Sequence, residues 1–471
     1  MSQINPLMHR FLLLLFFVIQ TVAVSAQTTG AKIARAFTSF EKDTLYQHAS
    51  VSLYVIEAAT GKVVFDKNSR MGLAPASTQK IITSVSAYEL LGQDYKFITN
   101  IGYQGTIANG VLKGNLIVNG SGDPTLGSWR WEGTKPDNVL NEWTQKIKAA
   151  GIQKIDGSVL ANTGSFAYQA IPDGWIWQDI GNYYGAGAYA INWKENQFDL
   201  QLTSGNAIGD AVVVKKEGEP VDYHNELRAA AKGTGDNAYL YFDGSISGTI
   251  PVSEKNFKIS AAETNPAGTL LTDFTLRLKA AGIDCKLSDA AANERSKTHG
   301  AAVAVAGIKP LVQQVSPSMD SIIYWFNKKS INLYGEALVK AIALQNNKPA
   351  ATDEGVKLIR DLWKQKGIGS GELNMEDGSG LSPLNRVTTH AQVEILKYAS
   401  TQTWFPAFYD ALPEYNGMKM KSGTISGVKG FCGYHKAKDG KEYIYSFLVN
   451  NYQGSASGLV QKMYKVLNEL K

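Results

Sequence analysis

The sequence contains few side chains of the kind that bind metal ions. Its 471 residues include two cysteines, Cys285 and Cys432, and six histidines. The cysteines have no CxxC spacing and the histidines follow no HExxH-like pattern, so neither set predicts a zinc site or a metal hydrolase. We expect both cysteines to be small buried hydrophobic side chains, although an oxidising compartment would permit a disulfide between them.

The sequence also lacks a concentrated run of basic residues. Its net charge of +5 comes from 47 basic and 42 acidic residues spread along the chain. This pattern does not match the basic patch that contacts a phosphate backbone, so we expect no nucleic-acid partner. With 44% hydrophobic and 19% charged residues, the composition is typical of a globular protein. The length is sufficient for two to four domains.

Only one long apolar run occurs, and it lies at the N-terminus. Arg10 precedes a mostly apolar stretch, residues 11–24, and the small residues Ser25 and Ala26 follow. This order predicts a secretory signal peptide over residues 1–26, and therefore an exported protein. An uncleaved N-terminal anchor is the alternative, although the stretch is short for a membrane span. After cleavage we expect no stable membrane span.

The two ends of the remaining chain carry patterns for one shared sheet. The N-terminal end predicts a helix, a β-hairpin and a second helix, and the C-terminal end predicts a strand, a hairpin and an amphipathic helix. The predicted strands span residues 50–57, 62–67, 418–424, 430–436 and 441–450. We expect an antiparallel sheet with helices on its faces, an α+β architecture in which the chain ends meet.

The middle of the chain has a different pattern. Short alternating runs are separated by Gly, Asn and Asp turns, and two helical patterns interrupt them at residues 138–151 and 268–282. We interpret residues 96–300 as a large β-rich insertion of one or two subdomains. The domain that this insertion interrupts would consist of residues 27–95 and 301–471.

Ser77 and Lys80 form the first candidate site. They lie at positions i and i+3 of a predicted helix, so they share one face. A serine hydroxyl beside a neutral lysine amine is a nucleophile–base pair, and burial or a second cation lowers a lysine pKa toward the neutral state. Alone, the SxxK motif is expected by chance in a chain of this length, and a helix-capping serine with a solvated lysine is the alternative.

A second candidate is Ser330-Ile331-Asn332, in a predicted helical region that spans residues 318–344. Ser330 could relay a proton to a leaving amine, and Asn332 could hydrogen-bond a substrate amide. Alone, this tripeptide fits a polar junction between a helix and a loop equally well.

The third candidate is Lys421-Ser422-Gly423-Thr424, on a predicted strand before the C-terminal hairpin. A cation and two hydroxyls suit a substrate carboxylate, and a glycine lets a substrate backbone lie close to the strand. The N–H that follows the glycine could complete an oxyanion hole. A solvated edge strand is the alternative.

The order of the three motifs makes them specific together. SxxK, then SxN, then K-[ST]-G is the signature of active-site serine penicillin-recognising enzymes. The chain resembles the low-molecular-mass penicillin-binding proteins of the D-alanyl-D-alanine carboxypeptidase/endopeptidase type, peptidase family S13. The 253-position gap between Ser77 and Ser330 matches the large insertion of that family. Further resemblance lies in residues 122–126, 177–179, 183–186, 265–267 and 377–382.

This resemblance implies a penicillin-binding/β-lactamase-like fold and a serine D-Ala-D-Ala carboxypeptidase, possessing endopeptidase activity in some members. Ser77 would attack the D-Ala-D-Ala amide and Lys80 would take its proton. Ser330 and Lys421 would relay that proton to the departing D-alanine. No metal and no cofactor is implied. The partners would be peptidoglycan stem peptides ending in D-Ala-D-Ala and β-lactam antibiotics that acylate the enzyme, in the periplasm or cell wall.

The same resemblance implies the substrate-binding residues. Asn332 would hold the penultimate amide of the substrate, and Ser422 and Thr424 would bind its terminal carboxylate beside Gly423. The N–H groups of Ser77 and Thr424 would form the oxyanion hole. Asp179 would bind the free end of the stem-peptide side chain.

Two residues depart from the usual motifs of this family. Ser422 stands where threonine is commoner, which keeps the hydroxyl, and Ile331 stands where aspartate is frequent, which removes a charge near the site. Two other functions remain open at this point. One is a catalytically silent peptidoglycan-binding protein, and the other is a β-lactamase or esterase with the same fold.

Overall fold

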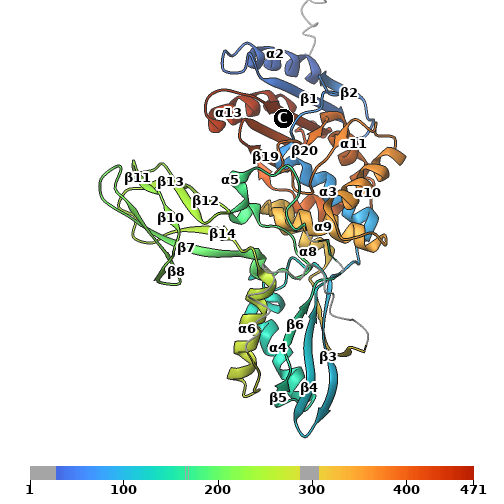
Figure 1. The fold of residues 1–471 in the computed structure, drawn as a ribbon. Coiled ribbons are helices and arrows are strands. Elements are labelled where there is room, and N and C mark those ends of the chain that lie inside the picture. The colour runs from blue at the N-terminus through green and yellow to red at the C-terminus, as the bar shows by residue number, and fades with distance from the viewer. Residues whose placement is uncertain (1–27, 165, 168, 287–306) are drawn as a thin grey trace, which may run out of the picture.

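The computed structural model describes residues 28–471, apart from residues 165, 168 and 287–306. The predicted signal peptide, residues 1–26, lies outside the described residues. None of the helices in the described part of the chain has the length and apolar character needed to cross a lipid bilayer. Figure 1 shows a main part that contains the first described helix and the C-terminus, and two lobes that project from it.

A six-stranded antiparallel sheet forms the centre of the main part, in the order β18-β19-β20-β21-β1-β2 (Figure 1). Its strands are β1 (Ser50–Glu57), β2 (Val63–Lys67), β18 (Glu414–Tyr415), β19 (Met418–Ile425), β20 (Val428–Lys436) and β21 (Glu442–Asn450). The N-terminal hairpin joins the C-terminal strands through β1 and β21, where Leu53 lies opposite Phe447. The predicted sheet in which the chain ends meet is therefore confirmed.

Helices cover both faces of this sheet because its strands alternate apolar side chains between two cores. Tyr445 and Phe447 of β21 contribute to the core under α2 and α13, and Ile444 and Leu448 contribute to the core on the opposite face. One face carries α2 (Thr29–Glu41) and α13 (Ala456–Leu467), and the other carries α3 (Lys80–Leu91), α8 (Met319–Lys328), α9 (Asn332–Gln345), α10 (Thr352–Gln365), α11 (Thr389–Ala399) and α12 (Phe405–Ala411). A two-stranded sheet of β16 (Leu373–Asn374) and β17 (Arg386–Val387) lies among these helices.

The region predicted to be helical from residue 318 to residue 344 is interrupted. Helix α8 ends at Lys328 and α9 begins at Asn332, and Ser330 between them has a φ of +57°. A positive φ is uncommon for a residue other than glycine and does not fit a right-handed helix. The break places the second motif at a helix–helix junction, and the prediction of one helical region is wrong at this point.

The first lobe is a five-stranded sheet packed against two helices. Its strands are β3 (Ile98–Ala108), β4 (Val111–Asn119), β5 (Lys154–Asp156), β6 (Val159–Asn162) and β15 (Lys309–Val315), and its helices are α4 (Pro136–Ala149) and α6 (Pro266–Ala280). Trp143 of α4 and Phe274 of α6 meet edge-on in its core, with ring centroids 5.3 Å apart.

The second lobe is built from two four-stranded sheets around a small core of its own. Its strands are β7 (Gln197–Ser204), β8 (Val212–Lys216), β9 (Glu219–Pro220), β10 (His224–Asn225), β11 (Arg228–Ala230), β12 (Asn237–Leu240), β13 (Ser245–Pro251) and β14 (Phe257–Ala262). The short helix α5 (Trp177–Ile180) lies where this lobe approaches the main part (Figure 1).

These two lobes are the β-rich insertion that the sequence predicts, and the α+β fold class is confirmed. The domain limits themselves stay a prediction. One pairing bears on them, because β15 follows the predicted boundary at residue 300 and yet pairs with β3 of the first lobe.

Candidate active site

The candidate nucleophile lies on a strained turn at the start of α3. Ala76 has a φ of +47°, and Ser77 follows it in a short 3-10 helix, Ala76–Gln79, that leads directly into α3. The Thr78 hydroxyl donates to the Pro75 carbonyl at 2.7 Å, which stabilises the turn. Strained backbone of this kind is concentrated at functional sites. Ser77 is partly exposed at this turn, whereas its neighbours are buried.

Lys80 lies one turn further along and is completely buried. Its Nζ is 3.0 Å from Ser77 Oγ, 2.6 Å from Asn332 Oδ1 and 2.7 Å from the Ser379 carbonyl oxygen. A neutral amine has two N–H donors and one lone pair. Lys80 can therefore donate to Asn332 and Ser379 and still present its lone pair to the Ser77 hydroxyl.

The surroundings of Lys80 favour this neutral state. Burial, followed by the nearby Lys421 cation, lowers the pKa of Lys80 well below its ordinary range. The carboxyls of Asp377 and Glu336 act in the opposite direction. A serine–lysine pair needs a desolvated lysine beside a second cation, and Lys80 beside Lys421 meets this requirement.

Ser330 and Lys421 form the second contact between the motifs. Lys421 Nζ donates to Ser330 Oγ at 3.0 Å and to the Ser422 carbonyl at 2.8 Å, and its side chain is almost completely buried. Burial lowers the pKa of Lys421 to about 7, with the Cys432 thiol opposing this shift and the Lys429 cation adding to it. Near neutral pH, Lys421 can thus both give and accept a proton.

Strand β19 brings the third motif against the nucleophile. A Cβ atom added to Gly423 would lie 2.9 Å from Ser77 N and 2.5 Å from the Pro75 carbonyl oxygen, so only glycine permits this approach. Thr424 is exposed and Ser422 is half-buried, which leaves both hydroxyls accessible. Strand β18 pairs with the first two residues of β19, Met418 and Lys419, and not with the motif that follows.

Asp179 is connected to this site through Tyr184. The Asn332 side-chain amide donates to the Tyr184 carbonyl at 2.7 Å, and the Tyr184 hydroxyl hydrogen-bonds to Asp179. Burial raises the pKa of Asp179 to about 6, against the lowering effect of that hydrogen bond. The structure therefore links Asp179 to Asn332, while the ligand that Asp179 would bind stays a prediction.

The buried segment at residues 377–382 supports Lys80, a role that the sequence did not reveal. The Asp377 carboxylate accepts from Gln79 Nε2 at 2.9 Å, from the Gly380 N–H at 2.7 Å and from Trp175 Nε1 at 2.8 Å. These bonds hold the Ser379 carbonyl in place against Lys80. The resemblance to the family singled out the segment, but a backbone carbonyl leaves no signal in a sequence.

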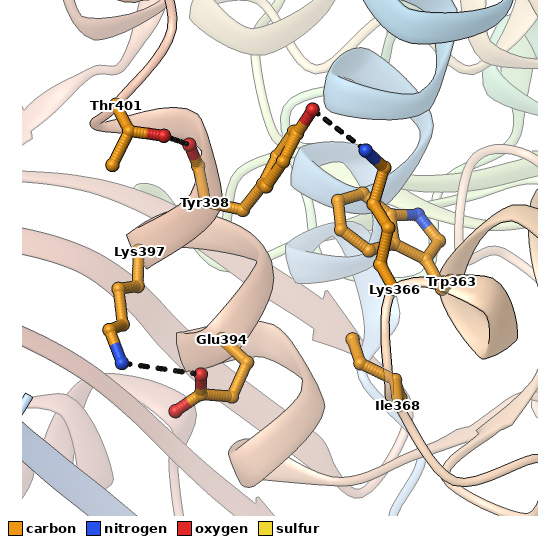
Figure 2. Close-up of a pocket in the computed structure, with 7 residues that line it drawn as sticks. All are labelled: Trp363, Lys366, Ile368, Glu394, Lys397, Tyr398 and Thr401. Carbon is orange, nitrogen blue, oxygen red and sulfur yellow. Dashed lines mark hydrogen bonds and ion pairs between the residues drawn. The ribbon is translucent and has the colours of Figure 1, made fainter.

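A surface pocket of about 250 Å³ lies between α10 and α11, apart from these residues (Figure 2). It is lined by Trp363, Lys366, Ile368, Glu394, Lys397, Tyr398 and Thr401. Its two lysines already have partners. Lys366 Nζ lies 2.7 Å from the Tyr398 hydroxyl and Lys397 Nζ lies 3.7 Å from Glu394, so this pocket presents no reactive group comparable to the Ser77 site.

Comparison with known proteins identifies the family of this chain. The model of the D-Ala-D-Ala carboxypeptidase 3 (S13) family matches residues 36–414. The chain belongs to this family. Its members are serine peptidases, so the predictions of the family and of an enzyme are confirmed.

Individual relatives are distant but match over most of their length. The chain is 24% identical over 477 residues to the D-alanyl-D-alanine carboxypeptidase of Actinomadura sp. (strain R39), covering 93% of this chain and 85% of that one. It is 25% identical over 419 residues to the D-alanyl-D-alanine carboxypeptidase DacB of Haemophilus influenzae, covering 83% of each. The crystal structure of penicillin binding protein 4 from H. influenzae shares the fold, with a TM-score of 0.75 at 22% identity, over 93% of this chain and 99% of that one.

Two findings concern the side chains that can bind metal ions. Among the residues that the structure describes, no group of three or more His, Cys, Asp or Glu side chains could hold a metal ion. Cys285 and Cys432 are both free and buried.

Proposed function

We propose that this S13 family member is a serine D-Ala-D-Ala carboxypeptidase that forms an acyl-enzyme on Ser77. The observation that carries the proposal is the 3.0 Å contact between Ser77 Oγ and the Nζ of the buried Lys80. The relatives named D-alanyl-D-alanine carboxypeptidase support the same activity.

The proposed acylation uses Lys80 as the base. Neutral Lys80 takes the Ser77 hydroxyl proton while Oγ attacks the carbonyl carbon of the D-Ala-D-Ala amide. The N–H groups of Ser77 and Thr424 stabilise the oxyanion that develops. The proton reaches the departing amine of D-alanine through Ser330, whose hydroxyl Lys421 contacts. Water then hydrolyses the ester and regenerates Ser77.

The remaining site residues would position the substrate. Asn332, already anchored to Lys80 and to the Tyr184 carbonyl, would bind the penultimate amide. Ser422 and Thr424 would bind the terminal carboxylate, and Asp179 would bind the free end of the stem-peptide side chain.

We also propose that penicillin acylates the same serine and that the enzyme acts on peptidoglycan outside the cytoplasm. A β-lactam complex of penicillin binding protein 4 from H. influenzae supports the first point by similarity, and the predicted signal peptide supports the second. Labelled penicillin should form a long-lived adduct with the wild-type protein, and Ser77→Ala should abolish it. Ser457→Ala, which changes an exposed serine on α13, should keep the adduct.

The outcomes separate the competing functions. An intact adduct in Ser77→Ala would contradict the assignment of the nucleophile. Fast release of hydrolysed penicillin would indicate a β-lactamase, and an absence of both D-Ala release and cross-bridge cleavage in muropeptides would indicate a silent binding protein. Mass analysis of products from cross-linked and uncross-linked muropeptides measures the balance between endopeptidase and carboxypeptidase activity.

A further inference from the structure

Lys429 lies next to the proposed carboxylate-binding hydroxyls. It is on β20, directly opposite Thr424 of β19, and its Nζ donates to Thr424 Oγ1 at 2.7 Å. The ammonium group is also 5.0 Å from the centre of the Phe431 ring, which covers one side of it. Lys429 is only partly exposed as a result, whereas Thr424 faces solvent.

No carboxylate among the described residues neutralises this lysine. Lys429 forms no ion pair with any residue that the structure describes, while Lys436 on the same strand pairs with Glu442 at 3.3 Å. Burial lowers the pKa of Lys429, which shows that its charge is partly desolvated. A desolvated cation without a partner is costly, and an anion placed beside it recovers that cost.

The other cations of the site are not suited to balance a substrate carboxylate. Lys421 is almost completely buried, donates to Ser330 and to the Ser422 carbonyl, and has a pKa of about 7. It therefore carries only part of a positive charge near neutral pH. Lys80 is buried beneath Ser77 and is assigned as the base.

We infer that Lys429 determines specificity for a C-terminal carboxylate by positioning the Thr424 hydroxyl and supplying the positive charge of that subsite. The inference rests on the proposed function and extends it. Because Thr424 Oγ1 accepts from Lys429, its own proton is free to point into the cleft and donate to the carboxylate. Hydrogen bonds to charged groups are roughly twice as strong as neutral ones, so the cation strengthens this contact.

The test compares two peptide substrates that differ only at the C-terminus. One ends in D-Ala-D-Ala with a free carboxylate, and the other ends in the carboxamide. Lys429→Met should lower kcat/KM for the acid by about 10- to 100-fold, the range for losing a charged hydrogen-bond partner. The rate with the carboxamide should change less than about threefold, and Lys429→Arg should largely restore the preference for the acid. Lys436→Met, a matched charge removal on the same strand, should change neither rate.

A binding measurement separates this inference from the proposed function. In a Ser77→Ala background, calorimetry should show that Lys429→Met weakens binding of the acid peptide at least tenfold. If this loss of binding is seen but the wild-type protein has no peptidase activity, the peptidase proposal is refuted and the inference about the carboxylate subsite still holds. Equal losses on acid and amide, no loss on either, or no measurable acid binding with Lys429 intact would overturn the inference. Thermal melting checks that each variant is folded, and Lys429→Gln replaces the Met variant if that one is not.

Discussion

At the scale of single residues, buried carboxyl groups near Lys80 oppose the lowering of its pKa. Glu336 of α9 is completely buried, and both of its carboxyl oxygens lie 3.1 Å from the Gly378 N–H. Burial, with the Asp377 carboxylate adding to it, raises the pKa of Glu336 to about 8. Glu336 is therefore largely neutral near pH 7, which limits the degree to which it favours the charged form of Lys80.

This raised pKa predicts how stability depends on pH. Its ordinary value is 4.5. Between that value and about 8 the folded state holds a proton that the unfolded state lacks, so Glu336 makes the protein less stable as pH rises through this window. Glu336→Gln removes the titration. Its melting temperature relative to wild type should increase from pH 5 to pH 8, as measured by thermal denaturation in a pH series.

The matched control is Glu219→Gln on β9, where the carboxylate is exposed. Its melting-temperature difference from wild type should stay flat across the same series. A flat difference for Glu336→Gln as well would show that Glu336 is already ionised at pH 5.

The sequence predicts the side chains of this site better than it predicts the backbone groups that hold them in place. Ser77, Lys80, Ser330 and Lys421 could be selected because their motifs are short and ordered. The Ser379 carbonyl could not, because any residue supplies a backbone carbonyl and only the folded chain shows which one faces Lys80.

At the scale of elements, the site depends on how closely β19 approaches the turn that carries Ser77. Gly423→Ala would place a Cβ atom 2.5 Å from the Pro75 carbonyl oxygen. The strand or the turn must then move, and misplacement by as little as 1 Å can cost on the order of 100-fold in rate. We expect the second-order rate constant for penicillin acylation to fall by about that factor, measured by stopped-flow or gel assay.

Gly371→Ala is the control, because an added Cβ atom there meets no atom within 4 Å. It should leave acylation unchanged. Acylation of Gly423→Ala within threefold of wild type would mean that the contact between β19 and the turn is not needed.

Local sequence patterns predict the strands near the site, but they do not predict the junction between α8 and α9. The strands β1, β19 and β21 match alternating apolar runs to within one residue of the prediction. The predicted helical region over residues 318–344 missed the break at Ser330, which only the alternative of a helix–loop junction anticipated, because a positive φ at a serine leaves no local signal in the sequence.

At the scale of the whole molecule, α9 connects the main part to the inserted region. Tyr334 donates to Glu195 at 2.8 Å, and Glu195 forms an ion pair with Arg130 at 2.7 Å. Six residues further along α9, the completely buried Lys340 donates to the carbonyls of residues 169, 170 and 188, at 2.7 to 3.2 Å. The helix that begins with Asn332 thus also holds the segments on either side of Asp179.

Removing this anchor should destabilise the region around Asp179. Lys340→Met removes the donor to the carbonyls of residues 169 and 188, while the carbonyl of residue 170 still accepts from the Ala188 N–H, and we expect this loss to cost about 2 kcal/mol. Hydrogen exchange should increase at residues 169, 170 and 188 and the melting temperature should fall. Lys348→Met, an exposed lysine beyond the end of α9, should change neither. Unchanged exchange in Lys340→Met would contradict the anchoring role.

The short alternating runs between Gly, Asn and Asp turns predicted the insertion, but they did not predict which strands attach it to the rest of the chain. Strand β15 pairs with β3 across about 200 positions, and nothing local in either strand specifies that partner. Buried lysines such as Lys340 are equally hard to predict, because lysine is usually exposed and only three converging carbonyls make this burial favourable.

The pairing of β1 with β21 has a consequence for the order of synthesis. Val51 pairs with Val449, so the sheet that holds β19 beside Ser77 cannot close until almost the entire chain has been made. A nascent chain carries Ser77 and Lys80, the proposed nucleophile and base, within its first hundred residues, yet Lys421 and Thr424 of the proposed relay and oxyanion hole are added only with β19. If Ser77 is the nucleophile, we therefore expect its reactivity to require the completed polypeptide.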